Sequence, residues 1–343
     1  MHQNGFTTTI LHSDRTQAVE HGAVHKPMHP SSEFAYEDSR ELAAVFQGKA
    51  GFTYARQGTP TTTALEAKIS QMERGKGTVS FATGMAALAA IFTTLLRRGD
   101  HLISSQYIFG NTNSLLGTLV ELGVEVTAVD ATDAEQVRAA VRPNTRMVFT
   151  ETIANPGTQI ADLAAIGTIC RELGLVYVVD NTLTSPWLFQ PCEVGASLVM
   201  NSLSKYIGGH GHALGGSVTD TGLFDWSGYD NIFESYRKGA PTSWGLTQIK
   251  KKGLRDMGAL WLPSPRIALP SVPRHWRCAW TGTAAMRWPW RGCWTRTLVW
   301  PRCITQGWPR IRSMIAPAVS SGMGVMAACW VSSWPTASIV STS

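Results

Sequence analysis

The chain has 343 residues, 44% of them hydrophobic, which is enough for one large domain or two ordinary ones with a sizeable core. No apolar run is long enough to cross a bilayer, the first residues carry no export signal, and the six cysteines form no CxxC pair, so we expect a cytoplasmic protein without disulfides or zinc. Of the 30 Lys and Arg residues, nine are arginines after Gly258, where no acidic residue and no lysine occurs, so the net charge of +6 hides a mildly acidic body of 21 basic against 24 acidic residues.

The predicted elements alternate along the middle of the chain. Residues 1–55 have little regular period and are expected to form an extended arm with a helix near 38–47. Strands are predicted at 78–82, 101–105, 124–129, 146–151, 175–180 and 197–203. Helices are predicted at 84–96, 112–122, 133–141 and 161–173. The alternation, with strands that are apolar along most of their length, predicts an α/β fold whose mostly parallel sheet is covered by helices on both faces.

The pattern breaks after Gly258. Ten of the 13 tryptophans lie there, prolines interrupt each candidate element, and no helical or strand period survives. We interpret residues 259–343 as the out-of-frame product of GC-rich coding DNA, in place of a native domain. The alternative is a tail that binds nucleic acid or a membrane surface, since arginines with interleaved aromatic residues suit both. No amphipathic period supports it, so neither nucleic acid nor a membrane is expected as a partner.

A single lysine, Lys205, follows an apolar predicted strand, with Ser202 and Ser204 before it and glycines behind it. A lysine amine whose pKa is lowered by burial or by nearby positive charge can form a Schiff base with a carbonyl compound. Pyridoxal 5′-phosphate (PLP) is the carbonyl cofactor of amino-acid chemistry. It requires a carboxylate at its ring nitrogen and a polar cradle for its phosphate.

Other strand ends offer these parts. Asp180 ends the run LVYVVD, at the edge where open α/β sheets bind ligands, although capping the next helix is an alternative role. Thr83 and Gly84 lie between a predicted strand and helix, where backbone N–H groups bind phosphate, although an ordinary βα turn has the same pattern. Asn155, in ETIANPGT, follows a third strand and is placed either to touch the cofactor ring oxygen or to form a turn.

Competing motifs are incomplete. The run GGHGHALGG lacks the GK[ST] of a phosphate loop, and Leu214 occupies the last glycine position of the dinucleotide-binding fingerprint. His210 and His212 lack carboxylate or cysteine partners at metal-ligand spacing, so no metal site is expected.

Taken together, YARQGTPTTTALEAKISQME, ATGMAAL, ETIANPGTQIADL, VVDNTLTSPWLFQP and NSLSKYIGGHG resemble the Cys/Met-metabolism PLP enzymes, over about residues 15–258. That family includes cystathionine γ-synthases, cystathionine lyases, O-acylhomoserine sulfhydrylases and methionine γ-lyases. The resemblance implies the fold-type I, aminotransferase-like architecture, with an N-terminal arm (1–55), a PLP-binding large domain (56–258) and a C-terminal small domain that is missing or replaced. It also implies a homodimer or homotetramer with shared active sites.

The resemblance implies roles for individual residues. Lys205 would be the Schiff-base lysine and proton carrier, and Asp180 the partner of the ring nitrogen. Asn155 would lie near the ring hydroxyl and the substrate carboxylate. Tyr54 and Arg56 would reach the phosphate of the neighbouring subunit. The remaining expected cofactor contacts are Thr83, Gly84, Met85, Thr182, Ser202 and Ser204.

Two departures from the family pattern bear on the reaction. Phe109, in IFGNT, stands where the family commonly stacks a tyrosine on the ring. A phenylalanine can still stack but has no phenol to move protons, which favours γ-replacement over a lyase. The predicted catalytic residues are Lys205 and Phe109. Nothing after Gly258 matches the segment that supplies the family's carboxylate-binding arginine, and substrate orientation is worth several kcal/mol. The expected reaction is γ-replacement on an O-acylhomoserine, giving cystathionine or homocysteine. The alternatives are a cystathionine or methionine β- or γ-lyase, and a catalytically impaired chain that at most binds PLP.

Overall fold

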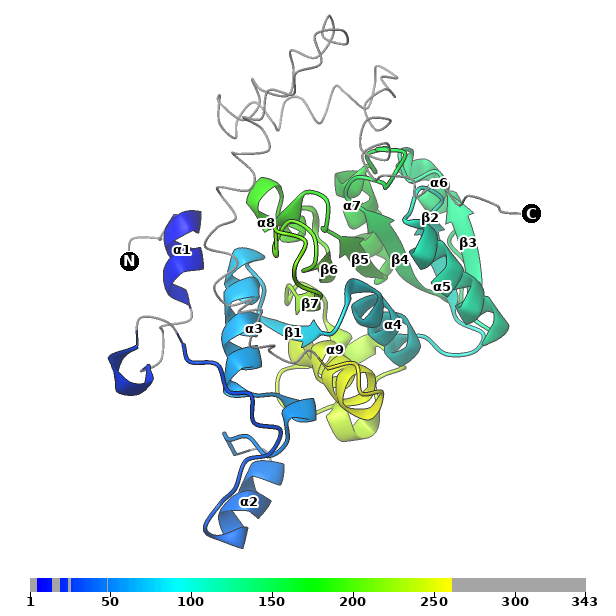
Figure 1. The fold of residues 1–343 in the computed structure, drawn as a ribbon. Helices are drawn as coiled ribbons and strands as arrows, with labels where there is room; N and C mark the ends of the chain where they lie inside the picture. Colours follow the sequence, from blue (N-terminus) through cyan, green and yellow to red (C-terminus); the bar gives the residue numbers. More distant parts are fainter. Residues whose placement is uncertain (1–4, 14–18, 24–25, 48, 261–343) are drawn as a thin grey trace, which may run out of the picture.

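The computed structural model describes residues 5–13, 19–23, 26–47 and 49–260 (Figure 1). The predicted out-of-frame segment, 259–343, lies outside these residues except for its first two positions. At the centre is a seven-stranded sheet with the strand order β1-β7-β6-β5-β4-β2-β3. Its strands are β1 (Gly77–Phe81), β2 (His101–Ser105), β3 (Glu125–Val129), β4 (Thr145–Glu151), β5 (Val176–Asp180), β6 (Leu198–Ser202) and β7 (Gly216–Asp220).

The sheet is mostly parallel, as predicted. Strands β2 to β6 pair in parallel, whereas β7 runs antiparallel to both of its neighbours, β1 and β6. All six predicted strands are present, each with ends within one or two residues of the prediction. The register places Glu151 of β4 opposite Asp180 of β5, and Ser202 of β6 opposite Gly216 of β7. The carboxyl ends of β4, β5 and β6 therefore share one edge of the sheet, where β7 begins.

Helices cover both faces of the sheet, as predicted (Figure 1). One core cluster joins strand residues such as Phe149 to Phe92 of α4 and Leu116 of α5, and the other joins Val148 to Ile166 of α7. Alternate residues of β4 thus enter opposite cores, which is why the strand is apolar along its length. The α-helices are α1 (Phe6–His12), α2 (Ser39–Phe46), α3 (Pro60–Met72), α4 (Gly84–Leu95), α5 (Gly110–Glu121), α6 (Ala134–Ala139), α7 (Leu163–Leu173), α8 (Ser185–Leu188) and α9 (Trp244–Gln248).

Helix α3 was not among the predicted helices, although its sequence holds a start signal. The side chain of Thr59 accepts from the backbone N–H of Thr62 at 3.1 Å, and the Thr62 hydroxyl accepts from Thr59 N at 2.8 Å, which forms a capping box with Pro60 as the first helical residue. Leu65 and Ile69 of α3 pack with Leu203, just before Lys205, so this helix supports the segment after β6.

Residues 26–47 and 49–57 form an arm that extends away from the sheet (Figure 1). Its helix α2, capped by Asp38, has no buried residue, and Phe46 is 66% exposed. The arm folds back on itself, since Tyr36 donates to the carbonyl of Phe52 at 2.9 Å. The helix expected near 38–47 is therefore present, whereas α1 was not predicted.

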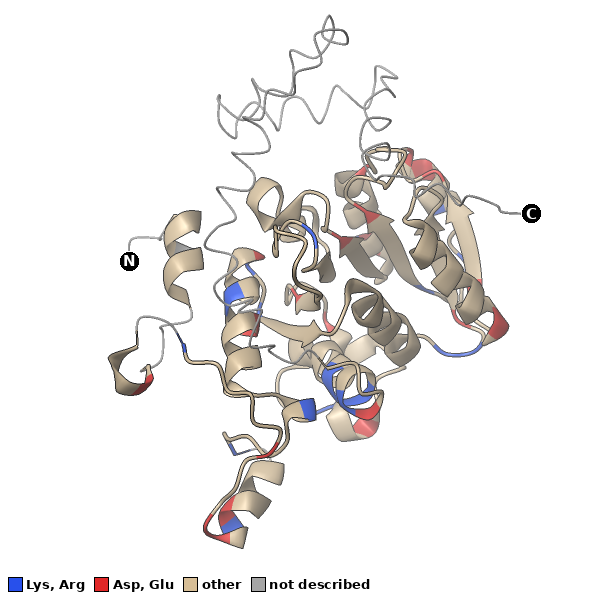
Figure 2. Cartoon of the chain, viewed as in Figure 1, with Lys and Arg blue, Asp and Glu red and all other residues tan. Residues whose placement is uncertain are grey.

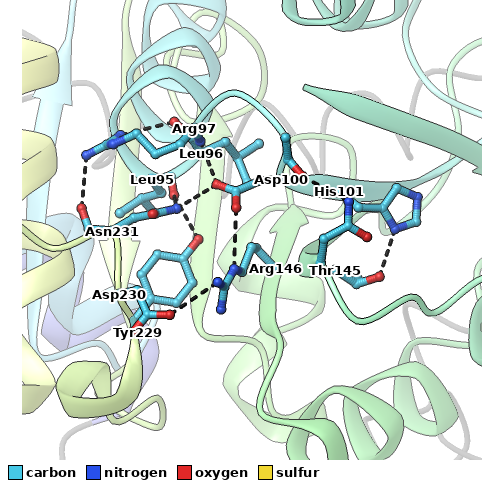
Figure 3. A network of polar contacts seen from close by, with 12 residues as sticks. Leu95, Leu96, Arg97, Asp100, His101, Thr145, Arg146, Tyr229, Asp230 and Asn231 are labelled. Atoms are coloured by element: carbon cyan, nitrogen blue, oxygen red, sulfur yellow. Dashed lines mark hydrogen bonds and ion pairs between the residues drawn. The ribbon is translucent and has the colours of Figure 1, made fainter. Parts of the chain in front are cut away.

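A polar network ties the start of β2 to the segment after β7 (Figure 3). The buried Asp100 carboxylate accepts from Arg97 N at 2.6 Å and from Asn231 Nδ2 at 2.7 Å, and it pairs with Arg146 Nε at 3.4 Å. The phenol of Tyr229 donates to the carbonyl of Leu95 at 2.9 Å. The network fixes the end of the sheet opposite to the carboxyl ends of the parallel strands. Within the part of the chain that the structure describes, no helix has the length and hydropathy of a membrane span.

Candidate active site

Three of the predicted cofactor residues meet at the carboxyl ends of β5 and β6. Asp180 is the last residue of β5 and is only 8% exposed. Its Oδ1 accepts from Thr182 N at 2.9 Å, and the hydroxyl of Thr182 accepts from Ser202 N at 2.8 Å. Asp180 does not cap a helix, because the next helix, α8, begins at Ser185. Among the described residues, Thr182 is the hydrogen-bond partner of this carboxylate, which leaves it room for a further donor at the strand end.

The amino end of α4 lies directly against this edge. Thr83 caps the helix by accepting from Ala86 N at 3.0 Å, and Gly84 is its first residue. A Cβ on Gly84 would lie 2.9 Å from Cβ of Ser202, and one on Gly216 would lie 2.1 Å from the carbonyl oxygen of Thr83. Only glycine permits this approach. The free backbone N–H groups at the start of α4 therefore lie beside the Ser202 hydroxyl, in an arrangement that suits an anion such as phosphate. Met85, the second residue of α4, packs against the core.

Lys205 lies in a loop that begins where β6 ends. The loop is closed by hydrogen bonds from Gly208 N to the carbonyl of Leu203 at 2.7 Å and from Gly209 N to the carbonyl of Lys205 at 2.7 Å. The Lys205 side chain is exposed and forms no hydrogen bond or ion pair with a described residue. The hydroxyl of Ser204 instead accepts from Gly215 N at 3.0 Å, which ties the two ends of the loop together.

The end of β4 contributes a residue that the sequence analysis did not single out. Glu151 is 7% exposed and lies beside Asp180 in the register. One of its carboxyl oxygens accepts from Phe109 N at 2.6 Å and the other from Asn155 N at 3.3 Å. Burial raises the pKa of Glu151, the Asp180 carboxylate raises it further, and burial likewise raises the pKa of Asp180. An acid at the end of a parallel strand, the signal used for Asp180, would also have found Glu151.

Phe109 and Asn155 thus lie next to the end of β4, and their predicted roles at the ring and the substrate stay predictions. Phe109 is the residue just before α5, and its ring is 39% exposed. Asn155 is exposed too. The side chains that are predicted to contact ring and substrate are therefore exposed around a buried pair of carboxyl groups.

Tyr54 and Arg56 lie at the base of the arm. The guanidinium of Arg56 lies over the Tyr54 ring at 5.3 Å, and its Nη1 donates to the carbonyl of Arg255 at 2.8 Å. Arg255 belongs to a π-helix, η8 (Ile249–Asp256), which is rich in basic residues (Figure 2). Neither Tyr54 nor Arg56 forms a hydrogen bond with the strand-end residues among those the structure describes. Their predicted contact with a neighbouring subunit stays a prediction.

The two histidines of the loop after Lys205 are stacked edge to face, with ring centroids 5.5 Å apart. Across the described ranges, no group of three or more His, Cys, Asp or Glu side chains is arranged to hold a metal ion.

Comparison with known proteins agrees with this geometry. The family described as "Cys/Met metabolism PLP-dependent enzyme" matches residues 7–262. An L-methionine γ-lyase of Fusobacterium nucleatum is 35% identical over 221 residues, covering 64% of this chain and 56% of that protein. A cystathionine γ-synthase of Mycobacterium leprae is 37% identical over 215 residues, covering 62% of this chain and 54% of that protein. The chain thus spans about half the length of these curated relatives.

A solved structure of a candidate O-acetylhomoserine (thiol)-lyase from Campylobacter jejuni superimposes with a TM-score of 0.73 at 26% identity, covering 80% of this chain and 72% of that one. That structure contains N′-pyridoxyl-lysine-5′-monophosphate. The predicted fold type I and the predicted cofactor, PLP, are confirmed by these matches.

Proposed function

Since this chain belongs to the Cys/Met-metabolism PLP-dependent enzymes, we propose that it is a cytoplasmic enzyme of sulfur amino-acid metabolism that carries out γ-replacement on an O-acylated homoserine. A thiol or sulfide would replace the acyl group, giving cystathionine or homocysteine. The observation that carries the proposal is the meeting of Asp180, Ser202 and the amino end of α4 at one sheet edge, followed directly by Lys205.

The residues at this edge fit PLP. The close approach of Gly84 to Ser202 leaves backbone N–H groups and a hydroxyl for the phosphate, with Thr83 and Met85 next to Gly84, while Ser204 is bonded to Gly215, which precedes β7. Asp180 is buried, and its carboxylate has room to hold a proton on the ring nitrogen. Thr182 fixes this carboxylate by donating its backbone N–H to Oδ1. Bound PLP supplies an aldehyde and a ring that takes up electrons from the substrate.

The remaining side chains act on the substrate. The amine of Lys205 is exposed and uncommitted, so it can bind the aldehyde carbon and later carry protons to and from substrate carbon atoms. The exposed Phe109 would face the ring with its own aromatic side chain, which carries no proton to transfer. Asn155, which is exposed after the end of β4, would orient the ring hydroxyl and the substrate carboxylate.

A homodimer or homotetramer with shared sites is part of the proposal. The arm carries Tyr54, which is 40% exposed, and helix α2, which buries no residue in this chain. A second copy that covers the arm would place Tyr54 and Arg56 at its own phosphate site. Arg56 donates one N–H to Arg255 and has further donors for a phosphate.

Two alternatives are supported by particular observations. A methionine or cystathionine lyase is favoured by the relatives, several of which are γ-lyases. An impaired chain is favoured by the family match, which ends at residue 262 and leaves the substrate carboxylate without an assigned arginine.

Product analysis of the full-length chain with PLP separates these functions. O-acetyl- or O-succinylhomoserine with cysteine or sulfide should give cystathionine or homocysteine, and Lys205→Ala should give neither. Methionine or cystathionine alone should release little oxoacid, and Phe109→Tyr should increase that release. Oxoacid as the main product would replace the proposal by the lyase, and bound PLP without any product would replace it by the impaired chain.

A further inference from the structure

The buried carboxyl group of Glu151 links two segments that approach the site from different parts of the chain. Phe109 precedes α5, and Asn155 follows β4, so the two lie 46 positions apart in the sequence. Each donates its backbone N–H to a different oxygen of the same carboxyl group, at 2.6 and 3.3 Å. No other described side chain forms a hydrogen bond with the backbone of either residue.

Burial of their own side chains does not fix the positions of Phe109 and Asn155. Both are exposed, and α5 has neither a side-chain cap nor an acidic residue in its first turn. Glu151 supplies from another element the acceptor that the helix start lacks. Backbone bonds also hold these segments, from Asn113 N to the carbonyl of Phe109 at 3.1 Å and from Ala154 N to the carbonyl of Gln159 at 2.9 Å, and the Glu151 carboxyl is the group that joins the two segments to each other.

We propose that Glu151 is a positioning residue, which holds the ring-stacking Phe109 and the substrate-facing Asn155 at fixed distances from Asp180. The link is direct, because Glu151 and Asp180 are opposite each other on neighbouring strands. The inference rests on the proposed function for the roles of Phe109 and Asn155, whereas the anchoring itself does not require a cofactor.

The charge of the pair suits this division of roles. Two buried carboxyl groups side by side are costly to ionise together. Burial and the Asp180 carboxylate raise the pKa of Glu151, while the two backbone donors lower it. A neutral Glu151 leaves the single negative charge on Asp180, where the ring nitrogen needs it. Glutamine should therefore replace Glu151 better than alanine does.

The test compares Glu151→Ala and Glu151→Gln with the control Asp220→Ala. Asp220 is also a buried carboxyl with two N–H donors, Gly222 N at 2.7 Å and Trp226 Nε1 at 3.3 Å, but it lies at the opposite end of the sheet. Hydrogen–deuterium exchange of the full chain without cofactor gives the first readout. Glu151→Ala should speed exchange in both 107–113 and 152–158, whereas Asp220→Ala should speed it in neither.

Glu151→Gln resolves the two contacts. Its amide oxygen can still accept from Phe109 N, but its NH₂ group faces the N–H of Asn155, so faster exchange is expected in 152–158 alone. This variant decides the question if Glu151→Ala does not fold. Wild-type exchange in both segments of both variants would refute the proposal.

The second readout is the binding of PLP, followed by absorbance and by the visible circular dichroism of the bound ring. Losing both hydrogen bonds in Glu151→Ala should raise the dissociation constant about tenfold and reduce the dichroism, with Asp220→Ala unchanged. A wild-type chain that binds no PLP would overturn the proposed function, while the exchange data would still decide the anchoring role. Unchanged affinity and dichroism in Glu151→Ala would refute positioning of the ring contacts.

Discussion

The buried Glu73, behind the site, should make the stability of the protein fall as pH rises. Its Oε1 accepts from Asn181 Nδ2 at 3.1 Å and from Asn201 Nδ2 at 2.6 Å, whereas its Oε2 and the Oδ1 of Asn201 have no partner among the described residues. Burial raises the pKa of Glu73 from 4.5 to about 7, and the two amide donors only partly offset this rise. Asn181 follows Asp180 and Asn201 precedes Ser202, so Glu73 links the two strand ends of the site.

The sign and size of the effect follow from linkage. A group whose pKa is higher in the folded state contributes stability that is present below its unfolded pKa and is lost as pH rises through its folded pKa. The window for Glu73 is therefore about pH 4.5 to 7. A pKa difference of this size corresponds to about 3 kcal/mol. Glu73→Gln keeps an acceptor oxygen and cannot ionise, so it should differ from wild type by less than about 1 kcal/mol at pH 5 and be more stable by up to about 3 kcal/mol at pH 8.

Urea unfolding at pH 5, 6, 7 and 8, followed by far-UV circular dichroism, measures this difference. The other buried carboxyl groups are the same in both proteins, so the difference isolates Glu73. Glu121→Gln, an exposed glutamate at the end of α5, is the control and should follow wild type at every pH. Parallel curves for Glu73→Gln and wild type across this range would show that the reasoning is wrong.

Two further predictions concern packing and the polar network. Gly84→Ala would place a Cβ 2.9 Å from Cβ of Ser202, which should lower the free energy of unfolding by about 1–3 kcal/mol and weaken PLP binding in a fluorescence titration. Gly117→Ala, whose Cβ would have open space, should leave PLP binding unchanged. Equal PLP affinities of Gly84→Ala and Gly117→Ala would contradict a phosphate site formed by Ser202 and the start of α4. Asp100→Ala should lower the free energy of unfolding by about 2–3 kcal/mol, because it leaves Arg97 N and Asn231 with fewer partners, whereas removing the exposed Glu125, which pairs with Arg142 at 2.8 Å, should cost less than about 1 kcal/mol. Similar losses in the two variants would argue against the network.

The elements that could be predicted from the sequence are those whose pattern of apolar residues matches the faces that they bury. The strands that carry Glu151, Asp180 and Ser202 were found because both of their faces are buried in a core, and Asp180 was found because it interrupts such a run. Strand β7 was missed, since its sequence, GSVTD, has one apolar side chain. Its polar residues can be buried because they find partners across the sheet, as Thr219 does with Thr78 at 2.8 Å. Such pairings depend on strand order, which local sequence does not specify.

Two further features, the π-helix η8 and the contact between Glu151 and Phe109, could not be predicted from local sequence patterns. The π-helix η8 has a wider turn than an α-helix, and a run such as IKKKGLRD gives no sign of the difference. Glu151 carries the same sequence signal as Asp180, an acid at the end of an apolar strand, but its contact with Phe109 N, 42 positions away in the sequence, is visible only in the structure. The positions of Lys205 and Asp180 at strand ends could be predicted from local sequence, and their roles stay predictions, whereas contacts that join separate segments required the structure.

Mapping where pyridoxal phosphate attaches tests the central claim most directly. The full-length protein would be equilibrated with the cofactor, reduced with borohydride, digested and analysed by mass spectrometry. A phosphopyridoxyl group on the peptide that contains Lys205, at about one per chain, is the predicted result. Labelling scattered over other lysines, or labelling that is no weaker in Lys205→Ala, would contradict the account.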